Sequence, residues 1–82
     1  MEKLNGQVAI VTGGGTGIGE GVALALAREG DKVAVCGRRG EPLEKTVAAI
    51  RELGGDGLAV QADVSDAEDV DQLVSITVEA YG

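Results

Sequence analysis

The glycines between Thr12 and Gly19 are the part of this sequence whose residue types point most clearly to chemistry. The stretch reads Thr-Gly-Gly-Gly-Thr-Gly-Ile-Gly and follows the apolar run from Val8 to Val11. Glycine permits a tight turn, and it lets backbone N–H groups approach an anion without side-chain collision. A helix that begins in this loop adds the partial positive charge of its N-terminus. The loop therefore predicts a site for a phosphate or diphosphate group.

Two adjacent arginines form a second candidate group. Arg38 and Arg39 follow Gly37, directly after the apolar run that ends at Cys36. A guanidinium group binds phosphate through two parallel charge-assisted hydrogen bonds. No carboxylate stands at the end of this run, where an acidic residue would accept hydrogen bonds from a free ribose diol. The pattern favours a nucleotide with a 2′-phosphate, and the alternative is that both arginines are only solvated surface charge.

The elements that must position these residues alternate along the chain. Three short apolar runs lie about 25 residues apart, and each is followed by a longer stretch with helical spacing. The runs are Val8 to Val11, Val33 to Val35 and Leu58 to Val60. This β-α-β-α-β-α rhythm predicts an α/β fold with a parallel sheet. Right-handed crossovers give the strand order 3-2-1, which leaves one edge of the first strand unpaired.

Each helical stretch is expected to turn one apolar face inward. The residues expected inside are Ile18, Val22, Ala23, Leu26 and Ala27 in the first stretch, Leu43, Val47, Ile50 and Leu53 in the second, and Val70, Leu73, Val74 and Val78 in the third. Gly30 and the pair Gly54-Gly55 are expected to end the first two helices, and the second is expected to begin near Pro42. Ser65, three residues before Glu68, predicts a capping box at the start of the third.

Composition limits the chain to one small domain, residues 1–82. The 82 residues are 44% hydrophobic with a single aromatic residue, so the core must be aliphatic. A net charge of −7 argues against nucleic acid or an anionic membrane as the main partner. The single cysteine, Cys36, and the absence of an apolar leader favour a reduced, cytoplasmic protein. The acidic residues from Asp63 onward lack the converging spacing of a cation site, so no metal is predicted.

The spacing of the glycine loop is T-G-x-x-x-G-x-G, and it resembles the motif of the short-chain dehydrogenase/reductase family. The residues that match are Thr12, Gly13, Gly17, Ile18 and Gly19. The resemblance covers essentially the whole chain but only about the first third of a typical member, and it implies a Rossmann-like half-fold. It implies a partial dinucleotide-binding domain that stops before the fourth strand. The catalytic Ser, Tyr and Lys of the family lie further on, so no catalytic residue is predicted here.

The same resemblance implies roles for individual residues. Asp63 would accept a hydrogen bond from the adenine amine and the backbone of Val64 would contact the ring, while Arg38 would bind the 2′-phosphate with Arg39 as a helper. Thr16 stands where many NADP-binding members have a basic residue. This departure counts against NADP but does not reverse the expectation from Arg38 and the missing carboxylate, so NADP is the expected cofactor, ahead of NAD. The full set of expected cofactor-binding residues is Thr12, Gly13, Gly15, Thr16, Gly17, Ile18, Gly19, Gly37, Arg38, Arg39, Asp63 and Val64.

Three functions stay open at this point. The first is a segment of an NADP-dependent oxidoreductase that transfers hydride between the cofactor and a carbonyl or alcohol, a class of enzyme that commonly forms homo-oligomers. The second is a stand-alone nucleotide-binding module without catalysis. The third is part of a methyltransferase that binds S-adenosylmethionine, because Gly13, Gly15 and Gly17 also fit a G-x-G-x-G spacing. This last hypothesis needs an acidic residue where the chain has Gly37, and whether the chain is itself an enzyme stays open.

Overall fold

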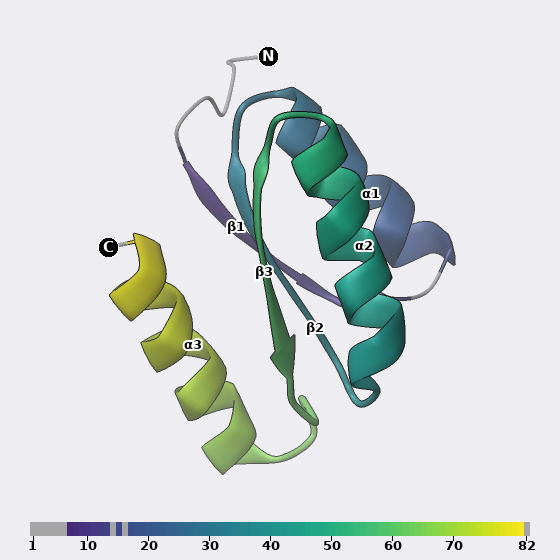
Figure 1. Ribbon diagram of the computed structural model, residues 1–82. Helices are drawn as coiled ribbons and strands as arrows, with labels where there is room; N and C mark the ends of the chain where they lie inside the picture. Colours follow the sequence, from purple (N-terminus) through teal and green to yellow (C-terminus); the bar gives the residue numbers. More distant parts are fainter. Residues whose placement is uncertain (1–6, 14, 16, 82) are drawn as a thin grey trace.

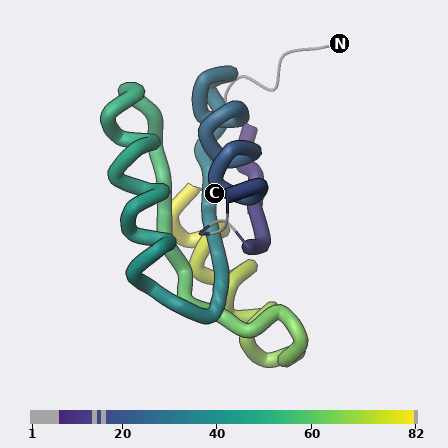
Figure 2. Tube along the Cα trace, turned by 90° about the vertical axis from the view of Figure 1, so that its right-hand side faces the viewer, coloured from purple at the N-terminus to yellow at the C-terminus, as the bar shows by residue number. Residues whose placement is uncertain are grey.

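The computed structural model describes residues 7–13, 15 and 17–81, in which three strands alternate with three helices. The elements are β1 (Val8–Thr12), α1 (Gly17–Arg28), β2 (Lys32–Gly37), α2 (Gly40–Glu52), β3 (Asp56–Gln61) and α3 (Ala67–Tyr81). Helices α1 and α2 cover one face of the sheet, and α3 covers the other (Figure 1). Figure 2 shows α1 and α2 next to each other in front of the sheet, with α3 behind it. The predicted Rossmann-like half-fold is confirmed.

All three strands are parallel, and β2 lies between β1 and β3. This arrangement confirms the predicted order 3-2-1. Thr12 pairs with Cys36, and Gly37 pairs with Gln61, so the three strands end at one edge of the sheet. We call this the carboxyl edge. It brings the glycine loop after β1, the arginines after β2 and Asp63 after β3 to the same side of the molecule.

The face of α1 that packs on the sheet is displaced from the predicted one. Gly19, Ala23 and Ala27 are buried, whereas Ile18 is 85% exposed and Val22 is 46% exposed. The reason is steric, because a stripe of glycine and alanine lets the helix axis approach the sheet more closely than branched side chains would. The prediction that Ile18 and Val22 point inward was therefore wrong, although Leu26 packs partly against the core.

Helix α2 packs closely on β3. Leu43, Val47 and Ile50 are buried as predicted, but Leu53 is 46% exposed because it follows the last helical residue. A Cβ added at Gly57 would lie 3.2 Å from the Ile50 side chain, a tight contact to which Ile50 would have to adjust.

Both predicted glycine stops are confirmed. Gly30 and Gly54 have positive φ values, 94° and 80°. After α2, the Gly54 N–H donates to the Arg51 carbonyl at 2.9 Å, and the Gly55 N–H donates to the Ile50 carbonyl at 3.0 Å. This pair of bonds is the Schellman arrangement, which satisfies carbonyls that a helix end leaves without partners.

Helix α3 begins one residue later than the sequence predicts. Asp66 caps it: its Oδ1 accepts the Glu68 N–H at 2.9 Å, and its carbonyl accepts the Val70 N–H at 3.1 Å. Ser65 instead donates its hydroxyl to Asp63. The predicted capping box from Ser65 is therefore wrong, because Asp66 is an equally good cap and the Asp63 carboxylate engages Ser65.

The inner face of α3 is narrower than predicted. Leu73 and Thr77 are buried, but Val74 is 47% and Val78 is 57% exposed. An apolar groove of about 230 Å³ is lined by Val74, Thr77 and Val78 of α3 and by two residues of β1. Among the described strands β1 pairs only with β2, as the predicted order requires. No helix in the described part of the chain is long and apolar enough to cross a membrane.

Candidate functional site

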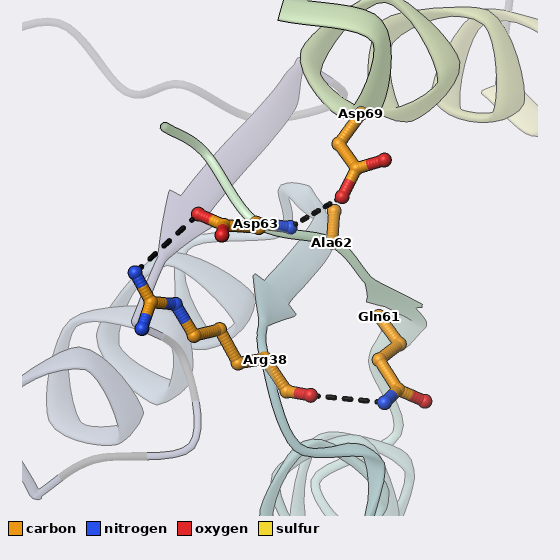
Figure 3. A pocket seen from close by; sticks show the side chains of 5 residues that line it. All are labelled: Arg38, Gln61, Ala62, Asp63 and Asp69. Carbon is orange, nitrogen blue, oxygen red and sulfur yellow. Dashed lines mark hydrogen bonds and ion pairs between the residues drawn. The ribbon is translucent and has the colours of Figure 1, made fainter. Parts of the chain in front are cut away.

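Two cavities open at the carboxyl edge and share Arg38. The first, of about 350 Å³, is lined by Arg38, Gln61, Ala62, Asp63 and Asp69 (Figure 3). The second, of about 240 Å³, is lined by Gly13, Gly15, Gly37, Arg38, Arg39, Pro42 and Leu43. We call them the acidic cavity and the basic cavity, because the first adds two carboxylates to Arg38 and the second adds a guanidinium group. Arg38 thus lies on the border between regions of opposite charge.

Glycine occupies positions of the loop after β1 for different structural reasons. Gly13 has φ 68°, a backbone conformation that favours glycine. At Gly15, an added Cβ would lie only 2.6 Å from the Cβ of Pro42, so glycine allows the first turn of α2 to approach the loop. At Gly17, an added Cβ would meet no described atom within 4 Å. Packing within the described chain therefore explains Gly15 but not Gly17.

The loop after β2 is tied to the end of β3. The Gln61 side-chain amide donates from Nε2 to the carbonyl oxygen of Arg38 at 2.9 Å. This bond fixes the backbone of Arg38, while its side chain is 75% exposed. Arg39 is exposed as well and forms the N-cap position of α2 with an extended backbone.

Asp63 lies at the centre of a polar network beside this loop. Its Oδ1 accepts the N–H of Ser65 at 3.0 Å and the hydroxyl of Ser65 at 2.7 Å, and it lies 3.5 Å from Nη2 of Arg38. The backbone N–H of Asp63 donates to Oδ2 of Asp69 at 2.8 Å (Figure 3). The hydrogen bonds from Ser65, and then the Arg38 charge, hold the pKa of Asp63 below its usual value. Asp63 is consequently an anion at neutral pH.

Comparison with known proteins identifies the family of this chain. The sequence profile described as short chain dehydrogenase matches residues 7–82. The chain belongs to the short-chain dehydrogenase family. Members of this family are oxidoreductases with a Rossmann fold that bind a nicotinamide dinucleotide, NAD or NADP.

Individual relatives agree with the family match. Versicolorin reductase 1 of Aspergillus parasiticus is 44% identical over 81 residues, which cover 98% of this chain and 31% of the relative. The short-chain dehydrogenase/reductase homolog YusS of Bacillus subtilis is 43% identical, and the match covers 100% of this chain and 75% of YusS. The hydroxysteroid dehydrogenase from Escherichia coli superimposes with a TM-score of 0.94 at 30% identity, covering 98% of this chain and 34% of that one. The chain thus spans about a third of the length of most of these short-chain dehydrogenases.

About half of the residues predicted for the cofactor line the two cavities. These are Gly13, Gly15, Gly37, Arg38, Arg39 and Asp63. The others that the structure describes lie at the end of β1, in the first turn of α1 or after β3, and line neither of these two cavities: Thr12, Gly17, Ile18, Gly19 and Val64. Thr16 lies outside the described residues.

Sequence reasoning missed three polar residues of this site. Gln61, Ser65 and Asp69 hold Arg38 or Asp63 through hydrogen bonds. A polar residue at the last position of a buried strand was the available signal for Gln61. Ser65 was instead assigned to the cap of the following helix, and Asp69 was considered only among the acidic residues that lack the spacing of a cation site.

Proposed function

We propose that the carboxyl edge binds NADP(H) and that Arg38 selects the 2′-phosphate. The observation that carries this proposal is the division of charge between the two cavities. The basic cavity presents Arg38 and Arg39, and none of the described residues that line it is acidic. The acidic cavity presents the ionised Asp63 as a hydrogen-bond acceptor. The adenosine end of NADP carries both an anionic 2′-phosphate and an amine that donates hydrogen bonds, so it suits this pair of environments.

The remaining residues have roles that follow from their places in the fold. The diphosphate would be held by backbone N–H groups of the loop and the first turn of α1, where the helix dipole is positive. That set comprises Thr12, Gly13, Gly15, Gly17, Ile18 and Gly19. Thr16 lies outside the described residues and joins the set on the sequence motif alone. Asp63 and Val64 would receive the adenine, and Arg39 would assist Arg38. NAD is the less favoured cofactor because Gly37 stands where a carboxylate would bind its ribose diol.

For the whole protein, we propose hydride transfer between NADP(H) and a carbonyl or alcohol substrate. When bound, the cofactor supplies or accepts the hydride, and the residues described here bind and orient its adenosine end. The family match and the reductases among the relatives support this proposal. As part of the same proposal, the enzyme is a homo-oligomer, and the free, buried Cys36 supports a reduced cytoplasmic setting.

Titration calorimetry with NADPH, NADH and S-adenosylmethionine in parallel tests the cofactor. We expect NADPH to bind more tightly than NADH by roughly tenfold or more, because charge-assisted hydrogen bonds contribute about 1.5–3 kcal/mol. Arg38→Asp should abolish this preference. Arg51→Asp, which makes the same change of charge at an exposed site on α2, should retain it. Equal affinity for NADPH and NADH, or tighter binding of S-adenosylmethionine, would contradict the proposal.

A second candidate is a nucleotide-binding module without hydride transfer. It is favoured by the match to YusS, a family homolog of which this chain spans 75%. The two candidates differ in whether the native protein continues past Gly82 into a further strand and the Tyr-x-x-x-Lys pair of the family. The intact mass of the protein isolated from its source separates them, because only a chain of full family length supports the first.

A further inference from the structure

We infer that Asp63 limits the affinity of this site for phosphate, because its carboxylate holds the Arg38 guanidinium that a 2′-phosphate would bind. Asp63 would then be a specificity-determining residue that weakens the binding of the 2′-phosphate. This inference rests on the proposed function, since it concerns the same phosphate subsite. It adds an internal competitor to that subsite.

The position of the Arg38 side chain supports this competition. Its backbone is fixed by Gln61 at 2.9 Å, and its side chain extends in the other direction, where Nη2 lies 3.5 Å from Oδ1 of Asp63 (Figure 3). Arg38 belongs to both cavities, and Asp63 belongs only to the acidic one. The guanidinium group is thus engaged with a carboxylate on the acidic side of the border.

The Asp63 carboxylate is held in place as the competing anion. Both hydrogen bonds from Ser65 reach the same oxygen, Oδ1, that faces Arg38. They favour the charged form, and the N–H of Asp63 is anchored on Asp69. A phosphate that reaches Arg38 must either displace this carboxylate from the guanidinium group or share the guanidinium group with it. Either event weakens phosphate binding.

Two small nucleotides isolate the effect. Adenosine 5′-monophosphate and adenosine 2′,5′-bisphosphate share the adenine and the 5′-phosphate and differ only in the 2′-phosphate. The dissociation constant of the monophosphate divided by that of the bisphosphate therefore reports the gain in affinity from the 2′-phosphate. Any change in adenine binding affects both constants and cancels in this ratio. Asp63→Asn preserves the size of the side chain and a carbonyl oxygen that accepts hydrogen bonds from Ser65, but removes the charge.

We expect Asp63→Asn to increase this ratio about threefold. The expected change is small because Arg38 is 75% and Asp63 is 39% exposed, and solvent screens an exposed ion pair. Asp71→Asn, which removes one negative charge from an exposed position of α3, should leave the ratio unchanged. In an Arg38→Gln background, Asp63→Asn should have no effect on the ratio, because the guanidinium for which the groups compete is absent.

The outcomes separate this inference from the proposed function. A ratio that falls or does not change in Asp63→Asn overturns the inference, and so does an equal increase in the Arg38→Gln background, which would indicate direct repulsion. If Arg38→Gln alone leaves the wild-type ratio intact, the phosphate subsite itself is wrong. If Asp63→Asn does not fold, carboxyl NMR of the wild-type chain decides. The bisphosphate should raise the pKa of Asp63 more than the monophosphate does, and equal effects would overturn the inference.

Discussion

Replacing Gly17 with alanine should affect the binding of a ligand without affecting the packing of the chain. An added Cβ at Gly17 would meet no atom within 4 Å in the described part of the chain, and the residue does not have a positive φ. Gly21, one turn further along α1, has the same two properties. The chain's own packing therefore permits alanine at both positions. Only Gly17 lies where the loop joins α1, at which point we propose that a diphosphate approaches the backbone.

The expected magnitudes follow from helix propensity and steric overlap. Alanine is about 0.8–1 kcal/mol more favourable than glycine in a helix interior, which for a domain of this size corresponds to roughly 4–8 °C in Tm. Gly21→Ala should show this increase, and Gly17→Ala should show a smaller one because Gly17 is the first residue of α1. A methyl group inside the diphosphate subsite should cost about 1–3 kcal/mol, or roughly 5- to 150-fold in NADPH affinity.

Thermal unfolding followed by circular dichroism, together with calorimetric titration of NADPH, measures both effects on the same samples. We expect Gly21→Ala to be more stable and to bind normally, and Gly17→Ala to be at least as stable as wild type and to bind poorly. If Gly17→Ala binds NADPH as tightly as Gly21→Ala, the loop does not contact the diphosphate. If Gly17→Ala instead unfolds well below wild type, then the space around Gly17 is needed by the chain itself, and the reasoning fails.

Two further predictions concern stability. Gly15→Ala should lower the free energy of unfolding by about 1–3 kcal/mol in denaturant titration, since its Cβ would lie 2.6 Å from the Pro42 Cβ. Gly37→Ala should lower it less, because its Cβ would lie at an ordinary 3.5 Å from the nearest side chain. Equal decreases in the two variants would contradict the argument. Burial and then the Asp56 carboxylate, which accepts the Tyr81 hydroxyl at 3.2 Å, raise the pKa of Tyr81 to about 12. Because the folded-state pKa lies above the ordinary value of about 10, protonated Tyr81 contributes to the free energy of unfolding. This contribution is complete below pH 10 and is lost as the pH rises toward 12. Near-UV absorbance follows this single aromatic residue directly; Asp56→Asn should lower the pKa, and a wild-type Tyr81 that titrates at its ordinary value would refute the prediction.

The arrangement of the sheet could be predicted because it depends on features that are local in sequence. Apolar runs, helical spacing and the glycine stops each mark an element, and the handedness of the crossovers leaves one strand order. The carboxyl edge then follows from the topology, since parallel strands end on the same side. For this reason the sequence predicts that Gly13, Arg38 and Asp63 lie near one another before any distance is known.

The details that sequence reasoning missed depend on competition between neighbouring residues. In α1 two stripes fit the helical period, and the stripe with Ala23 and Ala27 packs inward because the sheet requires a close approach. Ser65 and Asp66 are both good N-caps, and only the position of Asp63 decides between them. Periodicity and residue type give the candidates in each case, but the choice depends on contacts between elements.

The net charge of −7 and an anionic cofactor are compatible because charge acts locally at this edge. At physiological ionic strength, screening reduces interactions between exposed charges beyond about 8 Å. A dinucleotide phosphate in the basic cavity would therefore respond mainly to Arg38 and Arg39, and then to Asp63, which contacts Arg38 directly. A long polyanion would extend past this edge and meet the acidic surface. We therefore expect this edge to bind one phosphate group rather than a nucleic acid, and we expect Asp63 to be the acidic residue with the greatest influence on that group.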